Sequence, residues 1–79
     1  MPYPRRPRYE MPEFIRQALE EHGLTEAYSG RPPYQQNDYI GWITRAKREE
    51  TRQKRLAQML DELLSGDGYM NMPYRARNP

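Results

Sequence analysis

The fold is decided by the stretch Tyr39–Gly66, YIGWITRAKREETRQKRLAQMLDELLSG, which has two apolar stripes on either side of a basic segment. In the first stripe, apolar residues recur at positions i, i+3, i+4 and i+7, a spacing that puts them on one face of a helix. The second stripe repeats this pattern with leucine and methionine. The two stripes are Tyr39, Trp42, Ile43 and Ala46, and then Leu56, Met59, Leu60, Leu63 and Leu64.

The segment between the stripes predicts a break in the helix. Residues 47–55 contain no large apolar side chain. One helix running through them would rotate the second stripe by roughly a quarter turn from the first, at about 100° per residue. We therefore predict a break near Lys47–Glu50, so that two helices face each other. No glycine or proline enforces this break, and a continuous helix is the alternative. Gly66 is typical of a left-handed helix end.

Further helical signals precede this stretch. Pro12 suits the first position of a helix, an apolar stripe runs from Phe14 to Leu19, and Gly23 suits its end. Pro33 suits the first turn of the next helix. We predict three main helices at 12–22, 33–47 and 50–65, and a short helical turn at 24–29 with Leu24, Ala27 and Tyr28 pointing inward.

Together these signals predict an all-α fold: a small three-helix bundle with a short extra helical turn and disordered termini. The 79 residues are 35% hydrophobic and 30% charged, so the core must be small and its stability marginal. Residues 1–10 are expected to form a disordered, basic, proline-rich arm, residues 11–68 the helical domain and residues 69–79 a flexible tail. The predicted core is Phe14, Ile15, Leu19, Tyr39, Trp42, Ile43, Leu56, Met59, Leu60 and Leu63.

Several residues have more than one interpretation. Gly41 lies inside a predicted helix, where glycine costs about 1 kcal/mol relative to alanine, so we expect a neighbouring helix to approach closely there. A ligand lying over the helix is the alternative. Tyr34, Tyr69, Met70 and Met72 belong to no stripe, and we expect them to cover the core or to offer an apolar patch to a partner. Tyr39 and Trp42 favour core packing over a ligand pocket.

The sequence has no constellation that is typical of an enzyme. There are 0 Cys, and His22 is the sole histidine, whereas a metal site needs three or four convergent ligands. No serine or threonine has an identifiable base, and no glycine-rich phosphate loop is present. We expect no catalytic residue, no metal site and no cofactor. Because no apolar run reaches a membrane-spanning length and no signal-peptide core follows Met1, we expect a cytoplasmic protein without membrane association.

Several short motifs share the pattern of a known family. They are Met11-Pro12-Glu13-Phe14 with Ala18-Leu19, Tyr28, Tyr39-Ile40-Gly41-Trp42-Ile43, Ala46-Lys47-Arg48, and Thr51-Arg52 with Arg55-Leu56. Over roughly residues 11–66 the chain resembles the C-terminal domain of the YdeI/OmpD-associated, or bacteriocin-protection, family. The resemblance implies a compact helical domain of a bacterial cytoplasmic protein and a helix break before Thr51. Many relatives have proline where this chain has Glu49.

The basic segment contains the candidate contacts for a protein partner or an anion. Arg52 extends the second apolar stripe, and a guanidinium there needs a carboxylate or carbonyl partner. We expect Asp38 or a glutamate of the first helix to be that partner, and an external anion is the alternative. The candidate contact residues are Arg45, Lys47, Arg48, Arg52, Lys54 and Arg55.

These features predict a non-catalytic helical interaction domain, and the family resemblance implies a link to bacteriocin or stress tolerance. The expected partner is another protein or a second copy of the chain, since a small core gains from burial in an oligomer. The alternative is nucleic-acid binding through the basic start of the last helix and the arginine-rich ends. Arginine, lysine and glutamine near a helix start are the residue types that contact bases and phosphates.

Overall fold

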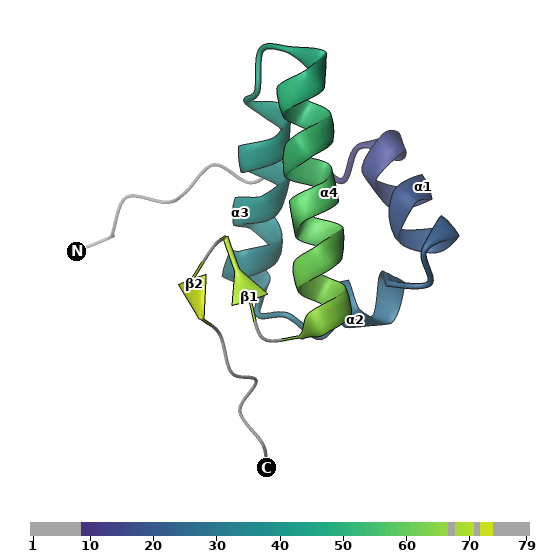
Figure 1. Cartoon of the computed structure of the whole chain (residues 1–79). Coiled ribbons are helices and arrows are strands. Elements are labelled where there is room, and N and C mark those ends of the chain that lie inside the picture. Colours follow the sequence, from purple (N-terminus) through teal and green to yellow (C-terminus); the bar gives the residue numbers. More distant parts are fainter. Residues whose placement is uncertain (1–8, 67, 71, 74–79) are drawn as a thin grey trace, which may run out of the picture.

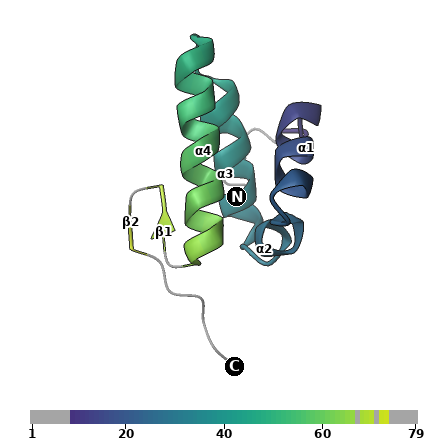
Figure 2. The ribbon, with the colours of Figure 1, turned by 45° about the vertical axis from the view of Figure 1, so that its right-hand side comes forward.

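The computed structural model describes residues 9–66, 68–70 and 72–73. The helices in this part of the chain are α1 (Glu13–Glu21), α2 (Thr25–Ser29), α3 (Pro33–Thr44) and α4 (Glu49–Ser65). They are followed by two short antiparallel strands, β1 (Gly68–Tyr69) and β2 (Met72–Pro73). Helices α3 and α4 run side by side in opposite directions, and the strands lie near the end of α4 (Figure 1 and Figure 2). The mostly helical fold with three longer helices and one short helix is thus confirmed.

The helix boundaries follow from local chemistry. Pro33 occupies the first turn of α3, where the missing N–H of proline has no intrahelical partner to lose. Helix α3 ends three residues earlier than predicted, at Thr44, whose hydroxyl donates to the Ile40 carbonyl at 2.7 Å. Residues 45–48 then separate α3 from α4, so the predicted break is confirmed and the continuous helix is wrong. Gly66 has a φ of 82°, which confirms the predicted left-handed end of α4.

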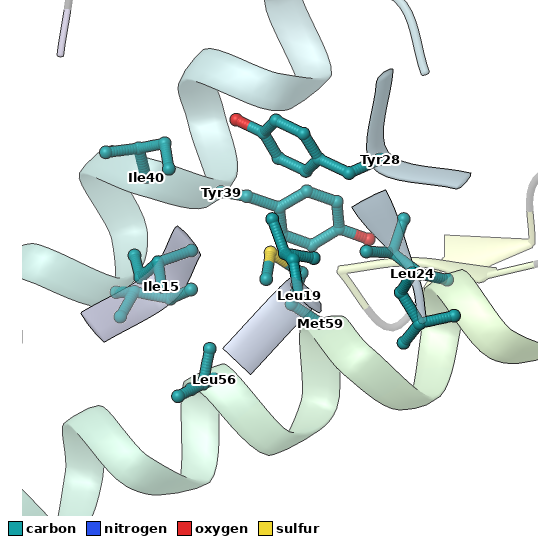
Figure 3. Packing of buried hydrophobic residues seen from close by; sticks show 10 residues of the cluster. Ile15, Leu19, Leu24, Tyr28, Tyr39, Ile40, Leu56 and Met59 are labelled. Carbon is teal, nitrogen blue, oxygen red and sulfur yellow. The ribbon is translucent and has the colours of Figure 1, made fainter. Parts of the chain in front are cut away.

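The core lies where α3 and α4 meet α1 and α2. Side chains from all four helices converge on it (Figure 3). Burying such a side chain contributes about 1.5–3 kcal/mol relative to leaving it exposed. Seven of the predicted core residues are buried, and the other three are partly buried against the same cluster. The seven are Ile15, Leu19, Tyr39, Ile43, Leu56, Met59 and Leu63, and the three are Phe14, Trp42 and Leu60.

Some side chains lie differently from the prediction. Leu64, placed on the second stripe, is 74% exposed, because the buried face of α4 continues through Glu62 and Leu63. Ala27 is exposed although it was expected to point inward, whereas Leu24 and Tyr28 are buried as predicted. Tyr39 is buried in the core, and Trp42 is partly buried and packs against it.

The predicted arm and tail both reach further into the fold than expected. Tyr9, placed in the arm, packs against the core, and so do Tyr69 and Met70 from the predicted tail. The two-residue strands were not predicted. The remaining residues of these two segments, 1–8, 71 and 74–79, lie outside the described residues, as does residue 67. Within the described chain, none of the helices combines the length and apolar character that crossing a bilayer requires.

The interpretation of Gly41 is also corrected. A Cβ added there would lie 2.5 Å from Cε2 of Tyr9, so the side chain that approaches this glycine is an aromatic ring and not a neighbouring helix. Glycine at position 41 leaves the room that the ring occupies. Replacing it would force the Tyr9 ring to shift, because real Cβ contacts are essentially never this short.

Candidate functional site

An open groove lies against the first part of α3, from Pro33 to Ile40. Its volume is about 510 Å³. The segment before α1, the end of α2 and one face of α3 line it. We call it the aromatic groove; its lining residues are Tyr9, Met11, Tyr28, Pro33, Tyr34, Gln36, Asn37 and Ile40.

The aromatic groove gathers exposed apolar side chains. Among the described residues, the large exposed hydrophobic side chains are Met11 at 36%, Tyr34 at 52% and Leu64 at 74%. Two of these three line this groove. Exposed apolar surface collected in one concave place is typical of a binding site, whereas a single exposed leucine is ordinary.

One wall of the groove is fixed by Tyr9. Its backbone N–H donates to Oδ1 of Asn37 at 2.9 Å, which ties the segment before α1 to α3. Its ring lies over Gly41, as described above. The Tyr9 wall is therefore held both by a hydrogen bond and by close packing.

A second wall of the groove is fixed by Tyr34. Its ring meets the Tyr69 ring edge to face, with centroids 6.2 Å apart. Its hydroxyl accepts a hydrogen bond from Nε2 of Gln35 at 3.1 Å. Tyr69 is itself anchored, because its hydroxyl donates to Oδ2 of Asp38 at 2.7 Å and its ring packs on Tyr39 at 5.5 Å. The wall is therefore preformed and not assembled on binding.

Tyr28 contributes a buried side chain to the same groove. Its hydroxyl donates to the Gln36 carbonyl at 3.2 Å, and burial raises its pKa to about 12. The group therefore stays protonated at neutral pH. It fixes the position of α2 against α3 and does not supply a charge.

A buried polar cluster, which sequence reasoning missed, holds the far end of the α3–α4 pair. Glu62 is 8% exposed, and its Oε1 accepts hydrogen bonds from the Tyr39 hydroxyl at 2.5 Å and from the Met70 backbone N–H at 2.7 Å. Its Oε2 accepts from Nε2 of Gln58 at 3.0 Å. Burial, and then the hydrogen bond to Glu62, raise the pKa of Tyr39 well above its usual value.

Arg31 completes this cluster. Its guanidinium is buried and donates to Oε1 of Gln35 at 3.1 Å and to the Glu62 backbone carbonyl at 3.1 Å. The cluster thus joins the loop before α3, α3 itself, α4 and the strand segment. One signal was available, because Glu62 follows Met59 by three positions and shares its helix face. Buried charges with this many partners are typical of structural ties.

Two of the six candidate basic residues, Arg52 and Arg55, make hydrogen bonds within the fold. Arg52 donates to the Ala46 carbonyl at 3.2 Å and to Oε1 of Glu49 at 3.1 Å. The predicted type of tie is thus present, but the expected partners, Asp38 or a glutamate of the first helix, are wrong. Arg55 donates to the Trp42 carbonyl at 2.6 Å, and its guanidinium carbon lies 5.3 Å from the centroid of that ring. Arg55 thus satisfies a carbonyl in the last turn of α3, where a positive charge suits the helix dipole, whereas Arg52 satisfies a carbonyl of the segment that follows α3.

The other four candidate residues form an exposed basic turn. They are Arg45, Lys47, Arg48 and Lys54, and all are exposed. Arg48 lies 3.8 Å from Glu50, with both side chains well exposed, so the attraction between them is weak. The structure therefore divides the predicted set into two structural arginines and four solvent-facing cations.

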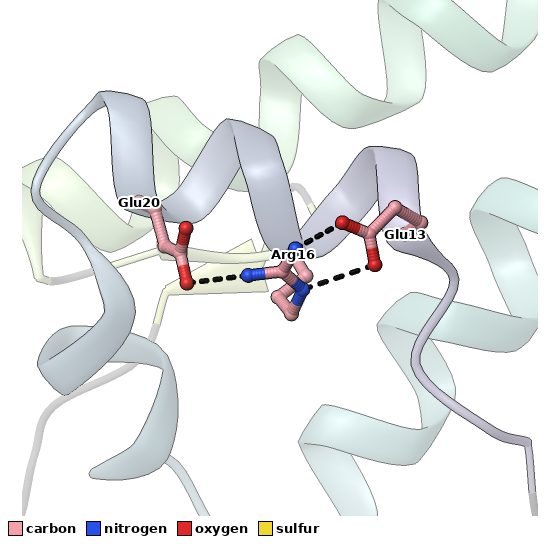
Figure 4. A network of polar contacts seen from close by, with 3 residues as sticks. All are labelled: Glu13, Arg16 and Glu20. Atoms are coloured by element: carbon pink, nitrogen blue, oxygen red, sulfur yellow. Dashed lines mark hydrogen bonds and ion pairs between the residues drawn. The ribbon is translucent and has the colours of Figure 1, made fainter.

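Helix α1 carries an exposed charged face. Arg16 donates to both carboxylate oxygens of Glu13 and to Oε2 of Glu20 (Figure 4). These hydrogen bonds lower the pKa of Glu13 and raise that of Arg16. Because all three groups are in contact with water, they contribute little to stability. His22 lies nearby, at a second groove of about 310 Å³ between α1 and α4. Among the described residues, no three His, Cys, Asp or Glu side chains converge as a metal site.

The relation to known proteins is clear at the level of the family. The sequence profile of the family described as bacteriocin-protection, YdeI or OmpD-associated matches residues 8–66. This range covers α1 to α4 and also Tyr9, Met11 and the rest of the aromatic groove. No curated protein and no solved structure matches the chain. The chain therefore belongs to the bacteriocin-protection, YdeI or OmpD-associated family.

Proposed function

We propose that the chain is a non-catalytic interaction domain that binds a protein partner through the aromatic groove. The observation that carries this proposal is the pairing of Met11 and Tyr34, two large exposed hydrophobic side chains that line one preformed groove. Tyrosine provides a large rigid contact area with a polar tip, which suits protein recognition.

The chemistry of the lining favours binding over catalysis. The groove residues include no histidine, carboxylate, cysteine or serine. The asparagine and glutamine side chains already bond within the fold, since Gln36 donates to the Arg31 carbonyl at 2.8 Å and Asn37 accepts from Tyr9. The titratable side chains that line the groove are the tyrosines Tyr9, Tyr28 and Tyr34, so a general acid or base among the lining residues would have to be a phenol.

The biological setting follows from the family. We propose that the domain corresponds to the C-terminal domain of its relatives, acts in the cytoplasm and contributes to bacteriocin or stress tolerance. In this role the domain would recruit a protein and need no cofactor.

A pull-down with nuclease treatment tests the proposal. The intact chain is compared with Tyr34→Ala and with Leu64→Ala, a matched variant that removes an exposed apolar side chain outside the groove. We expect a captured protein to survive nuclease, to be lost with Tyr34→Ala and to be kept with Leu64→Ala. Equal capture by the three chains would overturn the proposal.

Nucleic-acid binding is the second candidate. The basic turn favours it, because Arg45, Lys47, Arg48 and Lys54 are all exposed and lie at one end of the α3–α4 pair. Binding of this kind should weaken steeply as salt is raised, and replacing Lys47 and Lys54 with glutamine should reduce the salt slope. An affinity for duplex or single strands that does not change with salt would exclude it.

A further inference from the structure

We propose that the aromatic groove binds an extended, proline-rich segment that carries arginine. The inference rests on the proposed function, because it names the ligand class of the same groove. Proline-rich segments in the polyproline II conformation dock in grooves walled by aromatic side chains, where proline rings pack on flat faces. The rings of Tyr9 and Tyr34 supply surfaces of this kind, and Pro33 and Met11 line the same groove.

The hydroxyl of Tyr34 supplies a hydrogen-bond donor. This oxygen accepts from Gln35, so its own proton remains to be donated, and the described residues provide no acceptor for it. Polyproline II leaves every backbone carbonyl without an internal partner. A tyrosine hydroxyl at the edge of an apolar groove can therefore donate to the ligand backbone without requiring a particular side chain.

The charges around the groove are the reason for proposing a ligand that carries arginine. The lining side chains carry no charge. One carboxylate stands beside them: Glu10 is exposed and lies in the sequence between the lining residues Tyr9 and Met11. A carboxylate beside an apolar groove favours a cationic residue at the edge of the ligand.

The same charges disfavour a nucleic-acid strand in this groove. A single strand combines base stacking with cations that follow its phosphates. Here the lining offers aromatic faces but no lysine or arginine, and the neighbouring Glu10 is acidic. A proline-rich ligand also loses little conformational freedom on binding, because it is extended beforehand.

The chain itself provides a probe of this chemistry. Its residues 1–8 read Met-Pro-Tyr-Pro-Arg-Arg-Pro-Arg, with three prolines and three arginines. A synthetic peptide of this sequence can be compared with two controls: one with alanine in place of its prolines, and one with glutamine in place of its arginines. The first keeps the charge and the second keeps the extended backbone.

The test is a titration of the full-length, isotope-labelled chain with the three peptides, followed by amide NMR. We expect saturable shifts at Tyr34, Asn37 and Ile40 with the parent peptide, and affinities about tenfold or more weaker for both controls. Tyr34→Ala should abolish the shifts, and Leu64→Ala should leave them unchanged. Equal binding of the alanine peptide, or the same shifts with a single-stranded oligonucleotide, would overturn the inference.

Residues 1–8 of the chain have the sequence of the parent peptide, so a second titration tests whether they compete with it. The titration is repeated with a full-length chain carrying Pro2→Ala, Pro4→Ala and Pro7→Ala. Tighter peptide binding by this variant would support the ligand class, because it would mean that a segment of the same chemistry competes for the groove. No groove shifts with either chain would refute it. The proposed function would then still hold if Tyr34→Ala loses the captured protein, and would fail separately if it does not.

Discussion

Different side chains connect α3 and α4 at the two ends of the pair: partly exposed arginines at one end and a buried carboxylate at the other. At the basic turn, Arg55 donates from α4 to the Trp42 carbonyl in the last turn of α3, and Arg52 donates to the Ala46 carbonyl just after α3. Both side chains remain partly in water. At the other end, the buried carboxylate of Glu62 accepts from a tyrosine hydroxyl, a glutamine and a backbone N–H. We expect the hydrogen bonds at the two ends to contribute differently to stability, because burial decides how much free energy is lost when a partner is removed.

The largest effect is expected for Glu62→Ala. The change leaves the Tyr39 hydroxyl and the Met70 N–H without their acceptor in a buried place, so we expect a loss of about 3 kcal/mol in the free energy of unfolding. Urea denaturation followed by helical circular dichroism measures it. Glu62→Gln, which keeps the shape and one acceptor, should lose roughly half as much. If Glu62→Ala lost less free energy of unfolding than Arg55→Ala, the buried end would not be the more important one for stability.

Tyr39→Phe should give the next largest effect. It removes the hydroxyl that bonds Glu62 and keeps the ring, so the expected loss is about 1–2 kcal/mol at neutral pH. The pKa of Tyr39 is raised in the folded state, so its contribution is complete below the unfolded pKa of about 10 and falls as pH rises further. The gap between the two chains should therefore narrow above pH 10. A constant gap in denaturation curves taken across this range would be inconsistent with the buried hydroxyl.

Arg55→Ala tests the opposite end. The guanidinium loses a hydrogen bond to the Trp42 carbonyl and its place over the Trp42 ring, and water can replace part of the bond, so we expect a loss of about 1 kcal/mol. For a domain of this size, such a change lowers the melting temperature by roughly 4–8 °C. Arg55→Lys should recover only part of it, because lysine lacks the planar fork. Full recovery would assign the effect to charge alone.

The smallest effect is expected for Arg48→Ala. Its side chain lies in water, 3.8 Å from Glu50, so stability should change by less than about 0.5 kcal/mol. Thermal melts at low and high salt measure it, and they should agree within error. A larger loss would show that the basic turn stabilises the fold and is not simply available to a partner.

The helices could be predicted because their signals are local. The stripes of α1, α3 and α4 and the glycine at 66 involve residues within one or two turns of each other. The break after Thr44 was predictable because a continuous helix would have misaligned the two stripes. The boundary error at α3 is small, because helix ends depend on bonds such as that from Thr44 to Ile40.

The buried polar cluster and the aromatic groove could not be predicted, because they are assembled from distant segments. Glu62 bonds Tyr39, 23 positions away, and Arg31 bonds the Glu62 carbonyl, 31 positions away. A glutamate on an apolar stripe gives no indication of which donors will meet it. The prolines around Tyr9 predicted a disordered arm, so its contact with the core was not expected. Its hydrogen bond to Asn37 joins residues 28 positions apart. Helical spacing carries no information about such pairs.

The position of Met70 has a practical consequence for where the molecule can be shortened. The family match ends at residue 66, but Tyr69 packs on Tyr39 and Met70 donates its N–H to Glu62. A chain cut at Gly66 would retain every helix and yet expose one side of its core and leave a carboxylate short of a donor. A shortened chain that keeps these contacts therefore extends at least to Met70, beyond the end of the family match.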